Sequence, residues 1–190
     1  MSTRTKTFQN GVNVDQLNET IEHVKDKPEL ARFQFRAESE WVNGGQSRTE
    51  IQEFYGAGQE RSSLQEPFIL EGDEPPILLG NNTAPNAVET LLHSLASCLA
   101  VGVVYNAAAR DIEIDRLEMD LEGDMDLHSF LGLKEPDESR PGYEEIRVNY
   151  RVKSDAPREE VEELCAYVQK TSPVLDMLRN PVPVDVNLMS

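Results

Sequence analysis

The sequence predicts an α+β fold, and three observations lead to that prediction. Residues 90–109 form a stretch of 20 residues without a charged side chain, long enough for a central helix. Segments on both sides of this stretch alternate apolar and polar residues with the period of two that strands show. These strand-like segments come in runs and do not alternate singly with helices. Such an order favours an α+β arrangement over a βαβ fold.

The composition is that of a globular chain with a large excess of acidic residues. The 190 residues are 38% hydrophobic and 28% charged, with a net charge of −17, and we expect one domain over residues 1–190. Nucleic acids and anionic membranes attract basic proteins, so we expect neither as a partner. Two cysteines are too few for a disulfide scaffold, and no apolar run follows the N-terminal basic residues as in a signal peptide. We therefore expect a cytoplasmic protein with free thiols.

The N-terminal part of the chain predicts a helix followed by strands. Residues 13–27 place apolar side chains at helical spacing, and Pro28 ends this helix. Residues 1–30 are therefore expected to form a helical extension. Alternating apolar residues and turn signals then predict strands over residues 31–41, 48–58 and 66–72.

The uncharged stretch is expected to be a core helix. Glycine, proline and asparagine are frequent in residues 72–86, which predicts a loop, and the helix is expected to begin near Pro85 with Thr83 or Asn82 as its cap. Its length would suit a membrane span. However, His93, Ser94, Ser97, Gly102 and Asn106 make it too polar for a lone span, and no basic loop flanks it. A helix that is apolar on nearly all sides belongs in a protein core, so we expect no membrane.

The C-terminal part predicts two strands, two helices and a final strand. Apolar residues alternate over residues 112–126, but their parity changes near Arg116, which predicts a β-bulge. Ser172 and Pro173 have the residue types of an N-cap and a first helical position. The expected elements are an exposed loop at 128–143, a strand at 144–154, helices at 155–170 and from 173, and a strand at 181–188.

Cys98, in the middle of the central helix, is the first candidate for chemistry. A buried cysteine often serves only as a small hydrophobic residue, and a reactive thiol needs a helix N-terminus, a cation or a base nearby. Glu89 lies nine residues earlier, about half a turn out of phase, so it could serve Cys98 only from a second copy of the chain. Otherwise it is a first-turn carboxylate that the helix dipole favours. His93 is rotated about 140° from Cys98 and is a poor partner for it.

Other candidates favour structural interpretations. Cys165 falls on the apolar face of its predicted helix, where a packing role is expected. Alternate acids share one face of a strand, but the spacing of a calcium-binding loop is absent, so a solvated acidic face is expected. These acids are Asp120, Glu122, Asp124 and Asp126. We expect neither a metal nor a cofactor.

Three segments together resemble the OsmC/Ohr family, the osmotically inducible protein C and organic hydroperoxide resistance proteins. They are "APNAVETLLHSLASCLA", "RPGYEEIRVNYRV" and "KTSPVLDMLRNPVPVDV". The similarity runs from about residue 13 to the C-terminus. It is greatest to an OsmC-like branch that carries "DEPP-LLG" before the central helix and "SPV-D-L-NPVPV" near the end.

The resemblance implies an intertwined homodimer in which strands wrap around two long central apolar helices. It also implies that Cys98 is the peroxidatic cysteine, which attacks an organic hydroperoxide and becomes a sulfenic acid, and that Glu89 acts across the dimer. Family members resolve this acid with a second cysteine, whose position is held here by Ser172. The family's arginine has no match before the central helix, and neither Arg48 nor Arg61 is assigned to its role.

Two functional hypotheses follow from the resemblance. The first is a one-cysteine thiol peroxidase that reduces small organic hydroperoxides through Cys98, with an external thiol as reductant. The alternative is a catalytically reduced homodimer that binds a small apolar or thiol ligand, or senses oxidants. Ser172 separates this chain from two-cysteine members but does not decide between the hypotheses.

Overall fold

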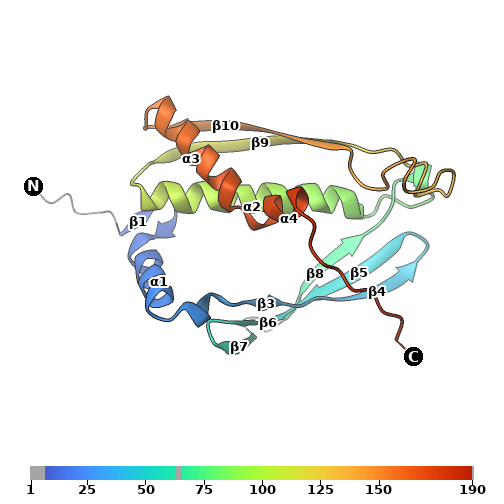
Figure 1. The fold of residues 1–190 in the computed structure, drawn as a ribbon, viewed down its shortest axis with the longest axis horizontal. Coiled ribbons are helices and arrows are strands. Elements are labelled where there is room, and N and C mark those ends of the chain that lie inside the picture. The colour runs from blue at the N-terminus through green and yellow to red at the C-terminus, as the bar shows by residue number, and fades with distance from the viewer. Residues whose placement is uncertain (1–6, 63–65, 190) are drawn as a thin grey trace, which may run out of the picture. The chain divides into compact units, whose positions relative to one another are not determined.

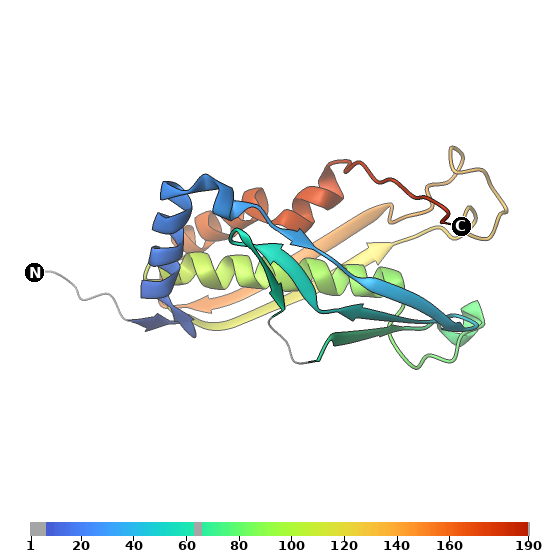
Figure 2. The same cartoon turned by 90° about the horizontal axis from the view of Figure 1, so that it is seen from below.

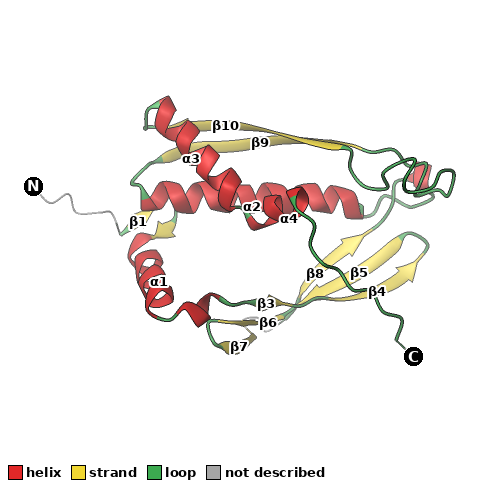
Figure 3. Cartoon of the chain, viewed as in Figure 1, coloured by secondary structure: helices red, strands yellow, loops and turns green. Residues whose placement is uncertain are grey.

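The structure is a computed structural model that describes residues 7–62 and 66–189. Contacts group the chain into two compact units, Met1–Val12 with Leu92–Ser190, and Asn13–Leu91. Both units contain helix and strand (Figure 3). The predicted α+β class is confirmed.

The predicted N-terminal helix is present as α1, Val14–Asp26, and Pro28 opens the short 3-10 turn η1, Pro28–Ala31. Asn13 caps α1, since its side-chain oxygen accepts a hydrogen bond of 3.1 Å from the backbone N–H of Gln16. Before the helix, β1 (Phe8–Gln9) and β2 (Val12–Asn13) form a short hairpin that the sequence pattern did not predict. Residues 1–6 of the predicted extension lie outside the described residues.

Two small antiparallel sheets build most of the Asn13–Leu91 unit. Their strand orders are β3-β6-β7 and β4-β5-β8. The strands are β3 (Gln34–Phe35), β4 (Glu38–Asn43), β5 (Gln46–Ile51), β6 (Glu53–Gly56), β7 (Gln59–Ser62) and β8 (Phe68–Gly72). The predictions of one strand over residues 31–41 and one over residues 48–58 were wrong, because β3 and β4 lie in different sheets, and so do β5 and β6. The aromatic rings of Phe33, Phe35 and Phe54 pack against one another where β3 pairs with β6, and these contacts stabilise the pairing.

Little of the Asn13–Leu91 unit is buried within one chain. Among its described residues Val14 is the one fully buried hydrophobic side chain. Trp41 is 74% exposed, and strand β8 shows Phe68, Ile69 and Leu70 to solvent. Burial of apolar area drives folding, so a face of this kind suits further contacts.

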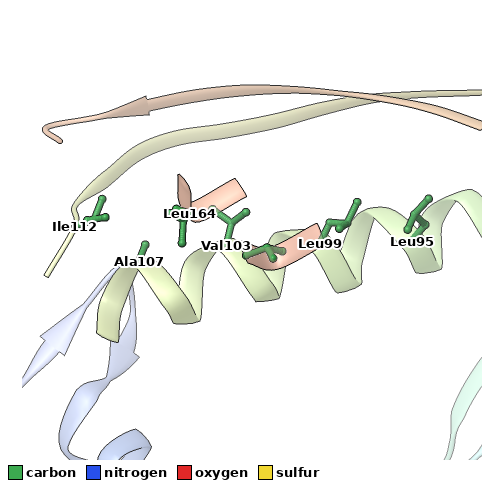
Figure 4. Packing of buried hydrophobic residues seen from close by; sticks show 7 residues of the cluster. Leu95, Leu99, Val103, Ala107, Ile112 and Leu164 are labelled. Atoms are coloured by element: carbon green, nitrogen blue, oxygen red, sulfur yellow. The ribbon is translucent and has the colours of Figure 1, made fainter. Parts of the chain in front are cut away.

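The core lies in the other unit, around helix α2, Ala87–Ala109 (Figures 1 and 4). Buried apolar side chains at every fourth residue of α2 form a stripe along one side of the helix. This stripe packs against β9 (Ile114–Asp124), β10 (Glu145–Ser154), α3 (Arg158–Thr171) and α4 (Pro173–Arg179). The stripe consists of Leu95, Leu99, Val103 and Ala107. Figure 2 shows the two strands running along α2.

Helix α2 buries this stripe but not its whole circumference. Val101 and Tyr105 are about half exposed within one chain. In length and composition α2 would also suit a membrane span, but core helices of soluble proteins meet the same criteria. The sequence predicted that α2 is buried on nearly all sides, and this would require another protein surface to cover the faces that the chain itself leaves exposed.

Strands β9 and β10 form an antiparallel pair and confirm the predicted bulge. Lys153 pairs with Arg116 and Ser154 with Ile114, so Asp115 is the extra residue. The shift keeps Ile114 and Leu117 both packed against the core. On the solvent side, three acids of the predicted face are exposed and partly neutralised by arginines of β10: Arg147 contacts Glu122 and Asp124, and Arg151 contacts Asp120. The fourth, Asp126, lies beyond the end of β9 and instead accepts hydrogen bonds from the N–H of His128 and the hydroxyl of Ser139.

The predicted strand at residues 181–188 was wrong. The segment has no regular structure, and no strand of the described chain pairs with it. Pro181 and Pro183 have no N–H to donate to a ladder. The alternating residues Val182, Val184, Val186 and Leu188 are all exposed. A period of two indicates a strand only where a sheet edge is available to pair with it.

Candidate functional site

Cys98 lies half-buried on α2, where it faces the junction between α3 and α4. Its Sγ is 3.2 Å from the Oγ of Ser172, a residue 74 positions later in the chain. Both residues belong to the unit that contains Leu92–Ser190. The structure therefore brings together two of the three residues that the resemblance assigned to the site.

Ser172 is held at this place by its backbone and by its side chain. Its N–H donates to the carbonyl of Val168 at 2.9 Å and closes α3. Its Oγ accepts a hydrogen bond of 3.4 Å from the N–H of Leu175 and opens α4, which confirms the predicted N-cap. Ser172 is only 4% exposed, so its hydroxyl points into the protein interior.

A glycine allows the two helices to approach at this point. A Cβ added to Gly102 would lie 2.7 Å from Cγ1 of Val168, closer than side chains pack. Gly102 is one turn after Cys98 on α2, and Val168 is one turn before Ser172 on α3. The contact between Gly102 and Val168 therefore sets the distance at which Cys98 meets Ser172.

Cys98 opens into a cavity of about 450 Å³ between α2, α3 and α4. Asn106 is turned back toward its own helix, since its Nδ2 donates to the carbonyl of Gly102 at 2.8 Å. The walls around the sulfur are mostly apolar or small side chains. The lining residues are Ser97, Cys98, Val101, Gly102, Asn106, Val168, Thr171, Ser172 and Pro173.

Glu89 occupies a structural position within its own chain. Its carboxylate accepts from the N–H of Asn86 at 2.9 Å, and its own N–H donates to the side chain of Asn86 at 2.9 Å. This reciprocal pair is a capping box, so Asn86 caps α2 and the predicted caps, Thr83 and Asn82, were wrong. Glu89 and Cys98 lie on opposite sides of α2, as their spacing predicted.

Thr83 is held instead by Asp73, a residue that the sequence analysis missed. Asp73 is buried, and its carboxylate accepts hydrogen bonds from the N–H and hydroxyl of Thr83 and from the N–H groups of Glu74 and Asn81. These bonds, those of Thr83 first, lower the pKa of Asp73 to about 2. The signal was an acid within a loop of glycine, proline and asparagine, where carboxylates commonly bind turn N–H groups.

Cys165 is neither bonded to Cys98 nor part of the same cavity. Both cysteines are free, and Cys165 lines a different cavity, of about 660 Å³, between β10 and α3. Burial raises the pKa of the Cys165 thiol, which keeps it in the unreactive neutral form. Tyr150 lies beside it, and burial, with Cys165 second, raises the pKa of Tyr150 to about 12. Among the described residues the buried Tyr150 hydroxyl has no hydrogen-bond partner.

The remaining candidates lie elsewhere. His93 is exposed, and its Nε2 is 3.5 Å from the hydroxyl of Ser97. Arg48 pairs with Glu50 on β5, and the side chain of Arg61 lies outside what the structure describes. Within residues 7–62 and 66–189, no group of three or more His, Cys, Asp or Glu is placed to hold a metal ion.

The arrangement can support chemistry at a single sulfur. Cys98 has a hydroxyl beside it, an apolar cavity in front of it, and no second thiol among its hydrogen-bond partners in the described chain. A thiolate at this position could attack a small electrophile that enters the cavity. Cys165 is not bonded to Cys98 and lines a different cavity.

Comparisons with known proteins identify the family and support the fold. The family model described as OsmC-like protein matches residues 80–187. An OsmC-like protein from Mycoplasma pneumoniae is similar in structure, with a TM-score of 0.59 at 18% identity over 78% of this chain and 89% of that one. An organic hydroperoxide resistance protein from Legionella pneumophila has a TM-score of 0.53 at 16% identity over 77% and 89%. No curated protein matches the sequence.

Proposed function

The chain belongs to the OsmC-like protein family, and from that premise we propose that it is a one-cysteine thiol peroxidase acting on organic hydroperoxides. The observation that carries the proposal is the sulfur of Cys98, which opens on an apolar cavity with the hydroxyl of Ser172 3.2 Å away. The Legionella pneumophila protein of similar fold is described as an organic hydroperoxide resistance protein, which supports this substrate class.

The proposed reaction begins with the thiolate of Cys98. The sulfur attacks the terminal oxygen of the hydroperoxide, an S–O bond forms, and the O–O bond breaks. The departing alkoxide takes a proton from water and leaves as the alcohol, while Cys98 becomes a sulfenic acid. The sulfur is oxidised by two electrons and the peroxide is reduced by two.

The walls of the cavity suit the organic part of such a substrate. Val101, Val168 and Pro173 offer apolar surface beside the sulfur. Apolar groups gain free energy when they leave water for such a surface, about 0.8 kcal/mol for each buried CH₂. A hydroperoxide with a hydrocarbon or aromatic body should therefore react faster than hydrogen peroxide, which has no apolar part.

An external thiol completes the proposed cycle, because Ser172 cannot act as a resolving thiol. A first thiol condenses with the sulfenic acid to give a mixed disulfide and water. A second thiol attacks that disulfide, releases the Cys98 thiol and leaves as an external disulfide. We expect small thiols of the cytoplasm to fill this role.

We further propose that the active form is a homodimer. Within one chain the Asn13–Leu91 unit buries one hydrophobic side chain among its described residues, and α2 leaves Val101 and Tyr105 about half exposed. A second copy would cover such surfaces, as in permanent dimers whose interfaces resemble a divided core. It could also bring the partner's Glu89 toward Cys98. Light scattering that finds a stable folded monomer at micromolar concentration would exclude this assembly.

The alternative is a homodimer that binds a small ligand or senses oxidants without turnover. It is favoured by the serine at position 172, which leaves an oxidised Cys98 without an internal partner. It is also favoured by Glu89, whose carboxylate is engaged in the capping box with Asn86. A sensor needs only the first step, oxidation of Cys98, whereas a peroxidase must also be reduced at a useful rate.

Mass spectrometry of the intact protein tests both hypotheses. After one equivalent of cumene hydroperoxide the protein should gain one oxygen atom, and an excess should add a second, because no internal thiol intercepts the sulfenic acid. A small dithiol should remove the first oxygen and sustain hydroperoxide consumption. The Cys98→Ser variant should gain nothing, and Cys165→Ser should behave as the parent protein. No oxygen gain at Cys98 would refute both redox functions, and gain without sustained consumption would favour the sensor.

A further inference from the structure

We propose that Ser172 is a positioning residue that activates Cys98, beyond its role as the cap of α4. Its hydroxyl donates a hydrogen bond to the sulfur of Cys98 and holds that sulfur in the thiolate form. The inference deepens the proposed function and rests on it for its purpose, since a peroxidatic cysteine reacts as a thiolate. Ser172 therefore has a role in the reactivity of Cys98, in addition to occupying the position of the family's second cysteine.

The hydrogen bonds of Ser172 assign its proton. A serine hydroxyl has one proton to donate and two lone pairs to accept with. One lone pair accepts the N–H of Leu175, which leaves the proton uncommitted. Among the described residues the one other polar atom at hydrogen-bond distance from Ser172 Oγ is the sulfur of Cys98, at 3.2 Å. The sulfur is therefore the acceptor that the described chain offers to the proton of this buried hydroxyl.

The two protonation states of Cys98 differ in how well they satisfy that hydroxyl. When Cys98 is a thiolate, the Ser172 proton binds a charged acceptor, and hydrogen bonds to charged groups are the strong ones. When Cys98 is a thiol, its neutral sulfur is only a weak acceptor for the serine proton. Ser172 is 4% exposed, so water does not easily replace that weak partner. The arrangement thus favours the thiolate.

No other described group near Cys98 takes this role. Tyr150 of β10 is within electrostatic range, but burial raises its pKa to about 12 and keeps it neutral. On α3, burial raises the pKa of Cys165, which is also neutral. Arg179 at the end of α4 influences Tyr150 but makes no hydrogen bond to Cys98. His93 of α2 contacts Ser97. The Ser172 hydroxyl is the direct contact.

The pH dependence of Cys98 alkylation tests the assignment. The experiment uses the full chain with Cys165→Ala, so that iodoacetamide reports on one thiol, from about pH 5 to 9. Ser172→Gly is the decisive variant, because glycine remains a good N-cap while the CH₂OH side chain, and with it the hydroxyl, is removed. Its alkylation rate at neutral pH should fall about tenfold, as expected for a lost hydrogen bond to a charged group, and its profile should move to higher pH. Ser172→Thr, which restores a hydroxyl, should recover most of the rate.

The outcomes separate this proposal from the peroxidase proposal. A Ser172→Gly profile that superimposes on that of the parent overturns the activating role, whatever the protein does with hydroperoxides. A shifted profile without hydroperoxide consumption keeps the role of Ser172 and refutes the peroxidase. If the glycine variant does not fold, the infrared S–H band of the Cys165→Ala protein decides. A weak band at neutral pH that grows on acidification supports the thiolate, and a full band at neutral pH excludes it.

Discussion

Replacing Gly102 with alanine should separate Cys98 from Ser172 without touching either residue. The added methyl carbon would lie 2.7 Å from Cγ1 of Val168, whereas carbon atoms pack at about 3.5–4.0 Å. The overlap is therefore roughly 1 Å. Val168 is 1% exposed and β-branched, so its side chain has few alternative rotamers with which to avoid the overlap. Helix α3 must move away from α2.

The effect on stability should be moderate, because two terms oppose each other. Overpacking of a core costs about 1–3 kcal/mol. Alanine in place of glycine inside a helix contributes up to about 1 kcal/mol of stabilisation. The free energy of unfolding should therefore fall by about 0–2 kcal/mol. The variant is expected to fold.

The effect at the site should be larger than the effect on stability. Movement of α3 by up to about 1 Å lengthens the 3.2 Å contact between Cys98 and Ser172 past ordinary hydrogen-bond distance. The alkylation rate of Cys98 at neutral pH should fall toward that of the Ser172→Gly variant. Thermal unfolding and alkylation kinetics on the same preparations measure the two effects.

A double-mutant cycle provides the matched control. Val168→Ala removes the methyl groups that collide with the new side chain and leaves a Cβ at 3.7 Å, an ordinary contact. The combined variant should be more stable than the sum of the two single changes predicts, by about 1 kcal/mol. A Gly102→Ala protein with unchanged alkylation, or a cycle with no coupling, would show that this close approach does not position Cys98.

Two further predictions use the same geometry and the loop before α2. Ser172→Cys should form a disulfide with Cys98 under mild oxidation, because the two side chains already meet at 3.2 Å. The cross-link joins residues 74 positions apart and should raise the free energy of unfolding by about 4 kcal/mol. A peptide map of the oxidised variant without this link would refute the expectation. Asp73→Asn should flatten the acid sensitivity of stability: the pKa of Asp73 is lowered to about 2, so its contribution is present above its unfolded pKa and is lost as pH falls from about 4 to 2. The difference in melting temperature between parent and variant should shrink over that interval, and a constant difference would exclude the carboxylate as its source.

Local patterns predicted most of the elements, because each pattern depends on near neighbours. Helical spacing of apolar residues predicted α1 and α3, the long uncharged stretch predicted α2, and the pair of Ser172 and Pro173 predicted the start of α4. The parity change near Arg116 predicted the bulge that the register of β9 and β10 contains. The prediction failed where several residues of a cap-forming type precede one helix. Thr83 and Asn82 were predicted as caps of α2, but Asn86 lies directly before the helix and forms the capping box.

Contacts between residues far apart in the sequence could not be predicted from local residue patterns. The alternation at residues 181–188 predicted a strand, yet a strand also needs a partner, and no strand of the described chain pairs with this segment. The distance between Cys98 and Ser172 depends on a close approach of α2 and α3 that a single glycine allows. The sequence placed Ser172 at the family's second position only through resemblance, without a distance.

The sequence by itself therefore determined the fold class, and the resemblance of its motifs determined the family and the choice of Cys98 as the candidate sulfur. Periodicity is enough for the fold class, since it records which faces must be buried. The tertiary structure decided what surrounds that sulfur, a hydroxyl at 3.2 Å and an apolar cavity, and it placed the second cysteine in a different cavity. Reactivity at Cys98 depends on those neighbours, and they come from helices far apart in the chain whose approach only packing can set.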